Sequence, residues 1–275
     1  MKKVLITGVN GFIGQALYNK LSSLYAVYGS SRNNIHNIAN WLYLDLSVKP
    51  EVNLFFKENK FDVIIHLATV LANKDNARDV SVFNDNLKIH TNLAEALDDY
   101  TGCHLINFSS SAVYPNLTGS FSEMDEINPS VNSDGLYGLA KFAGEMVFKA
   151  ILPKQIVQLH LRTGFVYGEG MNNSRIHPMF EQELGEHNFI TVFGDGLRTI
   201  PQIEIESLCK RIQYFITNCV AGTFNFADEN ISLKLLAQRI IDRHGNEQSY
   251  IKCKEEGNRQ EFKLNLQKLN LLFND

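Results

Sequence analysis

The alternation of strand-like and helix-like segments over the first 165 residues constrains the fold more than any other feature of this 275-residue sequence. Short apolar runs, such as residues 61–67, precede segments in which apolar residues recur at helical spacing, such as 82–97. The other strand-like and helix-like segments of this part are 4–6, 12–23, 26–29, 41–44, 105–108, 136–150 and 157–161. Strands that alternate with helices predict βαβ units, and therefore an α/β fold with a doubly wound parallel sheet.

The alternation stops after residue 165, where glycine and asparagine collect in residues 168–173. The remaining pattern predicts helices at 178–186, 207–218 and 232–244, a strand at 189–193 and a turn at 194–196. Ser232 is a suitable N-cap for the last helix, because its hydroxyl can accept a hydrogen bond from a backbone N–H. We therefore expect two regions, residues 1–165 and a smaller α/β region, 166–275, that is interleaved with the first.

Composition and charge exclude several classes of protein. The formal net charge is −4, so the chain lacks the basic excess typical of nucleic-acid-binding proteins. No apolar run reaches the roughly 18 residues of a membrane-spanning helix. Gly8, Asn10 and Gly11 interrupt the first apolar run too early for a signal peptide. The four cysteines are scattered, without the spacing of a metal or redox site. We therefore expect a cytoplasmic protein without a metal site.

A glycine-rich turn joins the first predicted strand to the first predicted helix, with Gly8, Gly11 and Gly14 in the segment VLITGVNGFIG. Glycine permits a tight turn and lets backbone N–H groups approach a pyrophosphate, and the helix N-terminus adds partial positive charge. Phe12 and Ile13 lie between these glycines and are included among the candidate cofactor-binding residues. A plain tight turn could also contain such glycines. Their position between a strand and a helix favours a Rossmann-type dinucleotide-binding domain.

The end of the second strand distinguishes between the two nicotinamide cofactors. An NAD site usually has a carboxylate here, which hydrogen-bonds a ribose 2′-hydroxyl. This sequence has Ser31 and Arg32 there and no acidic residue between positions 28 and 32. A hydroxyl and a guanidinium suit the 2′-phosphate of NADP, which a carboxylate would repel. We therefore predict that NADP(H) is preferred, with NAD(H) as the alternative if Arg32 is an ordinary surface residue.

Tyr137 and Lys141 are candidate catalytic residues, because positions four apart share one face of a helix. A tyrosine by itself has a pKa near 10, which is too high for acid–base catalysis at neutral pH. A neighbouring ammonium group stabilises the phenolate and lowers that pKa. Lysine can also hydrogen-bond the hydroxyls of the nicotinamide ribose. Taken alone, the pair is a weak signal, because a Tyr and a Lys four positions apart more often lie on a solvated helix face.

Three motifs together resemble those of the extended short-chain dehydrogenases/reductases, which include nucleotide-sugar epimerases, dehydratases and reductases. They are the GxxGxxG spacing of the first turn, the segment FSSSAVYP and the YxxxK pair. The resemblance implies a catalytic serine three residues before Val113, which is Ser110. Ser109 and Ser111 are the alternatives if the register differs by one. The implied reaction is hydride transfer at a carbon that bears oxygen, in which Ser110 polarises the carbonyl and Tyr137 transfers the proton.

The resemblance also implies contacts outside these motifs. Asp45 and Leu46 look like the family's adenine-contacting pair, and Asn86 matches an Asn of the helix that follows the fourth strand. The expected cofactor-binding residues are Gly8, Gly11, Phe12, Ile13, Gly14, Ser31, Arg32, Asp45, Leu46, Leu67, Ala68, Asn86, Tyr137 and Lys141. The expected substrate-binding residues are Ser111, Arg162, Asn172, Asn173, Arg175 and Arg198. The arginines are included because an anionic protein needs local positive charge to bind a phosphate-bearing substrate.

Differences from the family motifs narrow the reaction. Dehydratases carry an Asp-Glu pair where this chain has Ser111 and Ala112, and epimerase–reductases carry a cysteine at the position of Ala112. The sequence therefore favours NADPH-dependent reduction of a keto group, at C4, of a nucleotide-linked deoxy sugar. The alternatives are a sugar-nucleotide 4-epimerase with tightly bound NAD and a non-catalytic NADP-binding sensor or scaffold.

The match to the family is weaker in the second region. After the Gly-Asp-Gly turn the family usually has an Arg-Asp pair, but this chain has Ile200 and Pro201. The chain is also shorter than typical extended members, so we expect a small, trimmed substrate-binding region. Family members often dimerise through a four-helix bundle. A homodimer of this chain would therefore use the helices at 82–97 and 136–150.

Overall fold

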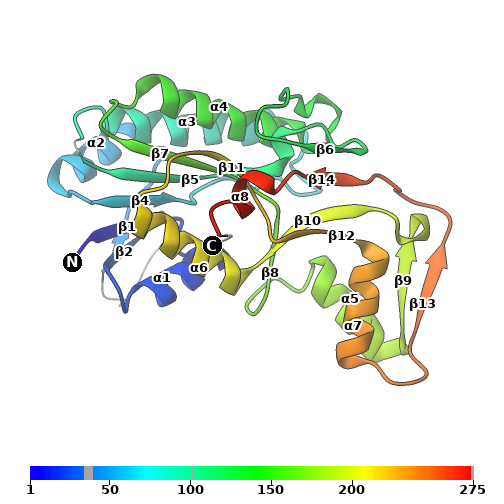
Figure 1. Cartoon of the computed structure of the whole chain (residues 1–275). Helices are drawn as coiled ribbons and strands as arrows, with labels where there is room; N and C mark the ends of the chain where they lie inside the picture. Colours follow the sequence, from blue (N-terminus) through cyan, green and yellow to red (C-terminus); the bar gives the residue numbers. More distant parts are fainter. Residues whose placement is uncertain (34–39, 101, 274–275) are drawn as a thin grey trace. The chain divides into compact units, whose positions relative to one another are not determined.

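A seven-stranded sheet lies at the centre of the first of the two units into which the chain divides (Figure 1). The computed structural model describes residues 1–33, 40–100 and 102–273. The first unit comprises Met1–Pro115, Met124–Thr163 and Glu206–Phe224, and the second comprises Asn116–Glu123, Gly164–Ile205 and Asn225–Asp275. The segment Glu206–Phe224, which the sequence-based division at residue 165 places in the second region, belongs to the first unit in the structure.

The large sheet has the strand order of a doubly wound fold. Its strands, in spatial order, are β11 (Gly222–Phe226), β7 (Val157–Thr163), β5 (His104–Ser110), β4 (Val63–His66), β1 (Lys3–Thr7), β2 (Ala26–Ser31) and β3 (Trp41–Tyr43). The six strands from β7 to β3 pair in parallel, which confirms the predicted sheet. The winding direction reverses between β1 and β4. Ligands of such sheets bind at the carboxyl ends of the strands beside that reversal.

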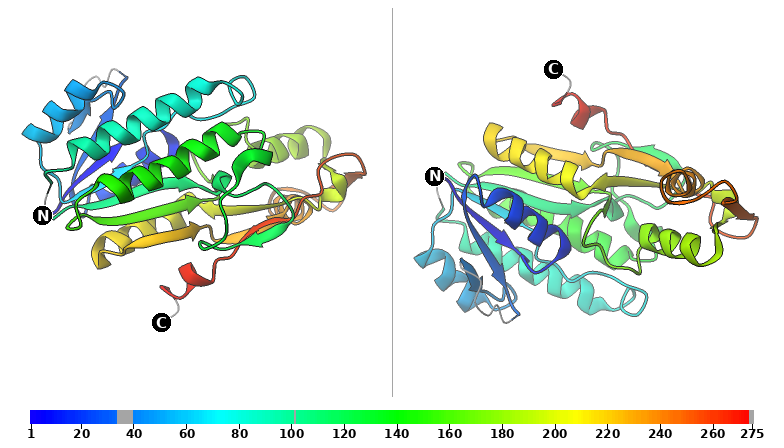
Figure 2. Two further views of the ribbon diagram at one scale, coloured as in Figure 1. Left: turned by 90° about the horizontal axis from the view of Figure 1, so that it is seen from above. Right: turned by 90° about the horizontal axis from the view of Figure 1, so that it is seen from below.

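Helices cover both faces of this sheet (Figures 1 and 2). One face carries α2 (Lys49–Glu58), α3 (Val80–Ala96) and α4 (Gly135–Ile151), and the other carries α1 (Phe12–Leu21) and α6 (Ile205–Asn218). The observed α1, α3 and α4 agree with the predicted helices to within two residues at each end. Phe56, Leu93 and Phe148 from the first group of helices join strand residues in one hydrophobic core.

Helix α2 is not among the helices that the alternation predicts. Pro50 lies in its first turn, where a missing backbone N–H costs nothing because the first helical N–H groups have no intrahelical partner. Its buried residues are Val52 and Phe56, four positions apart. This is the spacing of an amphipathic helix, so the sequence does contain a signal for α2.

Among the residues that the structure describes, the second unit consists of short strands, the α-helices α5, α7 and α8, and a short 3-10 helix at Gly194–Gly196. Its sheets are β12 (Glu229–Ser232), β10 (Thr199–Glu204) and β8 (Phe165–Tyr167) in that order, β13 (Tyr250–Lys254) with β9 (Phe189–Phe193), and β14 (Phe262–Leu264) with β6 (Gly119–Phe121). The helices are α5 (Ile176–His187), α7 (Leu233–His244) and α8 (Gln267–Asn270). Ser232 caps α7 as predicted, because its hydroxyl accepts a hydrogen bond from the backbone N–H of Leu235 at 3.2 Å.

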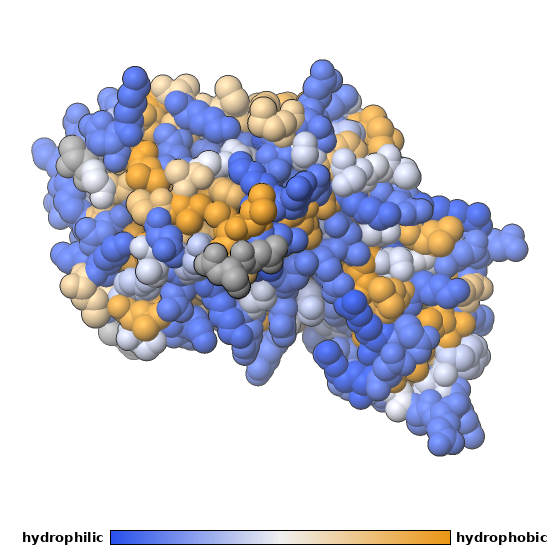
Figure 3. Space-filling view, viewed as in Figure 1, coloured by the Kyte–Doolittle hydropathy of each residue, from blue (hydrophilic) through white to orange (hydrophobic). Residues whose placement is uncertain are grey.

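The described residues contain no helix that is both long enough and apolar enough to cross a membrane. On the face shown in Figure 3, hydrophilic residues predominate and hydrophobic residues gather in several smaller groups. The most exposed large hydrophobic side chains, Met1, Met124 and Leu271, lie far apart in the sequence.

Candidate active site

The glycine-rich turn after β1 has the close backbone contacts that exclude other residues. Gly8 has a φ of +72°, and a Cβ there would lie 2.9 Å from the backbone N of Ala68. A Cβ at Gly14 would lie 2.6 Å from the Gly8 carbonyl oxygen. Real Cβ atoms do not approach other atoms so closely, and L-residues rarely adopt the Gly8 conformation. The turn is therefore a backbone cradle at the carboxyl end of β1.

The N-terminus of α1 suits a phosphate group. Gly11 is its N-cap and lacks a side chain that could cap the helix, and the first turn contains no acidic residue. The partial positive charge of this helix end is therefore not neutralised from within the helix. Gly11 is exposed, so a ligand can reach it. Together with its place beside the reversal of the sheet, this arrangement fits the pyrophosphate of a dinucleotide.

The carboxyl end of β2 is attached to this turn. The Ser30 carbonyl oxygen accepts hydrogen bonds from the backbone N–H groups of Gly8 and Val9 at 2.9 and 3.2 Å. The Ser31 hydroxyl accepts hydrogen bonds from the Asn10 side chain at 2.6 Å and from the Asn33 backbone N–H at 3.1 Å. Ser31 is buried and Arg32 is exposed. Arg32 therefore lies where a residue would contact the 2′-substituent on the adenosine ribose of a bound dinucleotide.

The carboxyl ends of β3 and β4 contribute further expected cofactor positions. The Asp45 carboxylate accepts hydrogen bonds from the backbone and hydroxyl of Ser47, at 2.9 and 2.7 Å, and Leu46 is buried. The Thr7 hydroxyl accepts the backbone N–H groups of Leu67 and Ala68, both at 3.2 Å. These bonds hold Leu67 and Ala68 beside the glycine turn.

The Asn86 side chain is engaged in hydrogen bonds within the protein. Its side-chain oxygen accepts hydrogen bonds from the Thr69 hydroxyl at 2.7 Å and the Val70 backbone at 2.9 Å. Its side-chain nitrogen donates to the carbonyl oxygens of Val70 and Val82, both at 2.8 Å. An amide can make about four hydrogen bonds, and the side chain is fully buried. This geometry argues against a direct cofactor contact. Asn86 instead fixes the loop that follows β4.

The serines at the carboxyl end of β5 and just after it differ in burial and in their hydrogen-bond partners. Ser109 is buried, and its hydroxyl donates to the Glu145 carboxylate at 2.6 Å. Ser110 is half-buried, and its hydroxyl accepts the backbone N–H of Ala112 at 3.1 Å. It caps the short helical turn η1 (Ser111–Val113). Ser109 therefore faces the core, whereas Ser110 and Ser111 retain exposure. The structure favours Ser110 over Ser109.

Tyr137 and Lys141 lie in the first two turns of α4. A Cβ at Gly138, next to Tyr137, would overlap the Ala112 carbonyl oxygen, so the start of α4 contacts the turn η1. Tyr137 is half-buried and Lys141 is 2% exposed. Burial lowers the pKa of Lys141 from 10.5 to about 8, although the Glu145 carboxylate acts in the opposite direction. The lysine is still mostly charged at neutral pH.

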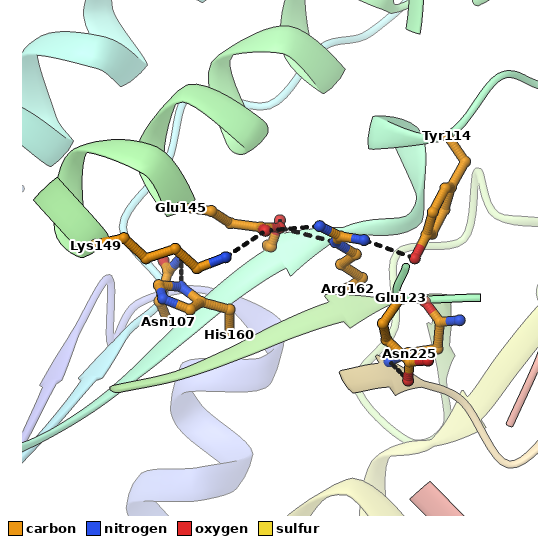
Figure 4. Close-up of polar contacts among 9 residues, drawn as sticks. Asn107, Tyr114, Glu123, Glu145, Lys149, His160, Arg162 and Asn225 are labelled. Carbon is orange, nitrogen blue, oxygen red and sulfur yellow. Dashed lines mark hydrogen bonds and ion pairs between the residues drawn. The ribbon is translucent and has the colours of Figure 1, made fainter. Parts of the chain in front are cut away.

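Arg162 does not occupy a position suited to the expected substrate contact. It is 4% exposed, and its Nε and Nη2 donate to the two carboxylate oxygens of Glu145 at 3.1 and 2.9 Å (Figure 4). Its Nη1 donates to the Tyr114 hydroxyl at 2.8 Å. A guanidinium engaged in this way beneath the surface is not available to a diphosphate. Arg162 is therefore better explained as part of a buried network.

Four other expected substrate-binding residues, Asn172, Asn173, Arg175 and Arg198, lie in the second unit and are exposed, whereas Ser111 lies in the first unit and is half-buried. Arg175 precedes α5 and its guanidinium lies over the Phe165 ring, 5.9 Å from the centroid. The Asn172 side chain accepts the Ser174 backbone N–H at 2.9 Å. The carbonyl oxygen of Arg198 accepts the Leu233 backbone N–H at 2.9 Å. Substrate binding by these four residues remains a prediction.

Glu145 and Tyr114 are components of the site that the sequence analysis did not identify. Glu145 follows Lys141 by four residues, just as Lys141 follows Tyr137. All three therefore share one face of α4. A carboxylate on the buried face of a helix requires a partner. The four-residue spacing from Lys141 was therefore the sequence signal that Glu145 belongs to the site.

The fold and this geometry define a nicotinamide-dependent enzyme with a Rossmann-type cofactor domain. The model of the NAD-dependent epimerase/dehydratase family matches residues 4–227. The chain belongs to the NAD-dependent epimerase/dehydratase family. It is therefore an NAD(P)-dependent enzyme, as the resemblance implies.

Similar proteins within and around this family have several activities. A dTDP-4-dehydro-6-deoxyglucose reductase of Escherichia coli is 27% identical over 263 residues, which cover 86% of this chain and 80% of the relative. A UDP-glucose 4-epimerase of Caenorhabditis elegans is 24% identical over 241 residues, covering 72% and 66%. The structure of a dTDP-4-dehydrorhamnose reductase of Bacillus anthracis in complex with NADP has a TM-score of 0.80 at 21% identity, covering 99% of this chain and 93% of that one.

Proposed function

We propose that this enzyme uses NADPH to reduce the C4 keto group of a nucleotide-linked deoxy sugar. The observation that carries the proposal is the end of β2. There Ser31 is held against the glycine turn by Asn10, Arg32 is exposed, and no carboxylate is present between positions 28 and 32. A 2′-phosphate is stabilised by such a guanidinium, and a cofactor that dissociates after each turnover suits a reductase.

The relatives support the class of substrate. The E. coli relative is named for the reduction of a dTDP-linked 4-dehydro-6-deoxy sugar, and the C. elegans relative for the epimerisation of UDP-glucose. Both names describe chemistry at a sugar carbon of a sugar nucleotide. Ala112, which stands where the family's dehydratases and 3,5-epimerases carry acid–base residues, favours simple ketoreduction.

In the proposed reaction the bound cofactor supplies the hydride to the carbonyl carbon. Ser110 donates a hydrogen bond from its hydroxyl to the carbonyl oxygen and so favours the negative charge that develops there. Tyr137 gives a proton to the same oxygen as the general acid. Tyr137 then becomes a phenolate, which the Lys141 ammonium stabilises. The same ammonium can hydrogen-bond the nicotinamide ribose. Asn86 holds Val70, in the loop that follows β4, and Thr7 holds Leu67 and Ala68 of the same loop.

A 4-epimerase is the second candidate, because the C. elegans relative has that name and the same Ser–Tyr–Lys group serves both reactions. An epimerase oxidises and then reduces its substrate on one retained cofactor. It therefore forms a 4-epimer without net consumption of NADPH, whereas a reductase consumes one NADPH for each product molecule. This difference in stoichiometry separates the two functions.

The test is turnover of the purified chain with a panel of 4-keto-6-deoxy and 4-hydroxy sugar nucleotides, with NADPH or NADH. We expect NADPH oxidation with a 4-keto substrate and a marked preference for NADPH over NADH. Replacing Arg32 by Ala should raise the KM for NADPH by about 10-fold or more, since a charge-assisted hydrogen bond contributes about 1.5–3 kcal/mol. The KM for NADH should change little.

The variant Tyr137→Phe serves as the catalytic control. It should lose most turnover and keep its affinity for NADPH, because it removes only the proton donor. A clear preference for NADH, epimer formation without net oxidation of NADPH, or normal turnover of Tyr137→Phe would contradict the proposal.

A further inference from the structure

We infer that Glu145 is a positioning residue, which fixes the serine of β5 and the Tyr–Lys pair of α4 relative to each other. The inference rests on the proposed function, in which Ser110 and Tyr137 must act on the same carbonyl oxygen. Glu145 itself is 0% exposed and does not reach solvent. It acts through its neighbours and is not a catalytic residue.

The Glu145 carboxylate joins three elements of the first unit (Figure 4). It lies on α4, one turn after Lys141. It accepts the hydroxyl of Ser109, on β5, at 2.6 Å. It also accepts two hydrogen bonds from Arg162, on β7, at 3.1 and 2.9 Å. Ser109 immediately precedes Ser110, so one carboxylate connects the strand of the catalytic serine to the helix of the catalytic lysine.

The far end of the serine segment is held by the same ion pair. Arg162 donates to the Tyr114 hydroxyl at 2.8 Å, and its guanidinium lies 5.1 Å from the centroid of the Tyr114 ring. Tyr114 follows the turn η1 directly and is fully buried. Ser109 and Tyr114 therefore anchor both ends of the segment that contains Ser110. Asn132 adds hydrogen bonds to the carbonyl oxygens of Ala112 and Tyr114 at 2.8 and 2.9 Å.

Stability alone does not explain this network. Removing two charges from water is costly, and a buried ion pair is often no more stable than well-packed apolar side chains of similar volume. Hydrogen bonds to both oxygens of a carboxylate, however, fix direction as well as distance. Catalysis needs that fixed direction, because a misplacement of about 1 Å in a reacting group can cost about 100-fold in rate.

Two variants test the inference, each of which removes a single oxygen from the network. We expect Ser109→Ala and Tyr114→Phe each to lower kcat by about 10-fold or more, because Ser110 loses one anchor. The Kd for NADPH, measured by fluorescence titration, should stay within about twofold of the wild-type value. The double variant should be little worse than the more severe single variant, because both changes act through the Glu145–Arg162 pair.

Tyr100→Phe is the matched control. It also removes a tyrosine hydroxyl from the first unit, one that donates to the Asn59 carbonyl oxygen at 2.5 Å. The Tyr100 ring lies against Phe56 and below the Lys60 ammonium, and neither residue belongs to the network. Its kcat should be unchanged. A wild-type kcat in Ser109→Ala and Tyr114→Phe, or an equal loss in Tyr100→Phe, would overturn the positioning role while leaving the proposed function intact. A wild-type enzyme without turnover on any sugar nucleotide would overturn both.

Discussion

Lys141 is the residue whose surroundings bear most directly on the reaction. Burial, and secondarily the charge of Lys141, lowers the pKa of His66 on β4 and of His90 on α3, so both histidines are neutral. The Glu145 carboxylate favours the charged lysine. With a pKa of about 8, Lys141 is charged at pH 7 and becomes neutral as the pH rises through 8. The charge that the proposed reaction needs beside Tyr137 is therefore present at neutral pH and lost in alkaline solution.

We predict that kcat of the wild-type enzyme decreases above about pH 8, because Lys141 then loses the charge that supports proton transfer by Tyr137. The measurement is kcat between about pH 6 and about pH 10, at saturating NADPH. Lys141→Arg keeps its charge over this whole range, since arginine does not deprotonate in proteins. The residual kcat of that variant should not decline at about pH 8. A decline at the same pH in both enzymes would assign it to another group.

At the scale of elements, two helical glycines show that glycine can be required by close packing in one helix and serve no packing purpose in another. Gly14, in the first turn of α1, is closely surrounded, since a Cβ there would lie 2.7 Å from the Cα of Val9. Gly185 lies within α5, and a Cβ there would have no described atom outside its own helix within 4 Å. The sequence pattern around a helix does not distinguish these two environments. Only the packing of neighbouring segments does.

We predict that Gly185→Ala raises the midpoint of thermal unfolding, because alanine in a helix is favoured over glycine by about 0.5–1 kcal/mol. Gly14→Ala should lower the midpoint and weaken NADPH binding, since the turn after β1 must shift to make room. Calorimetry and fluorescence titration provide the two measurements. If both alanine variants changed stability in the same direction, the close packing described for Gly14 would be wrong.

At the scale of the whole molecule, three buried histidines surround Phe148 and make stability depend on pH. The ring centroids of His66, His90 and His160 lie 5.7, 5.6 and 6.4 Å from that of Phe148. Burial lowers the pKa of His66 to about 3 and that of His160 to about 4, and it also lowers the pKa of His90. All three are therefore neutral in the folded chain across the physiological range.

We predict that the free energy of unfolding falls as the pH is lowered from about 6.5 towards 4. Below about pH 6.5 the unfolded chain takes up protons on these histidines, while the folded chain does not, so protons favour unfolding. Each histidine contributes up to about 1.4 kcal/mol per pH unit. Urea unfolding at several pH values measures the slope. His90→Leu should reduce the slope, whereas the same change at the exposed His187 should not. Equal slopes in all three proteins would contradict this account.

Much of the first unit follows from local pattern. Each signal spans about 20 residues or fewer: an apolar run of strand length, a helical periodicity, or the glycines after the first strand. The parallel sheet and the helices α1, α3 and α4 could therefore be predicted from the sequence. In the second unit, β9 at Phe189–Phe193 agrees with the predicted strand, but the other strands could not be predicted. For example, β6 at Gly119–Phe121 pairs with β14 at Phe262–Leu264. Three-residue strands carry almost no periodicity, and their pairing depends on residues more than a hundred positions away.

The sequence by itself determined the class of fold, the cradle for a dinucleotide and the residue types available for hydride transfer, because these depend on spacing along one turn, strand or helix. The tertiary structure decided which of those residues face the site and which face the core. In the structure the Ser109 hydroxyl donates to the Glu145 carboxylate, whereas Ser110 is half-buried. The Arg162 guanidinium binds Glu145 and Tyr114. Burial and partners come from other elements of the chain, so local spacing cannot reveal them.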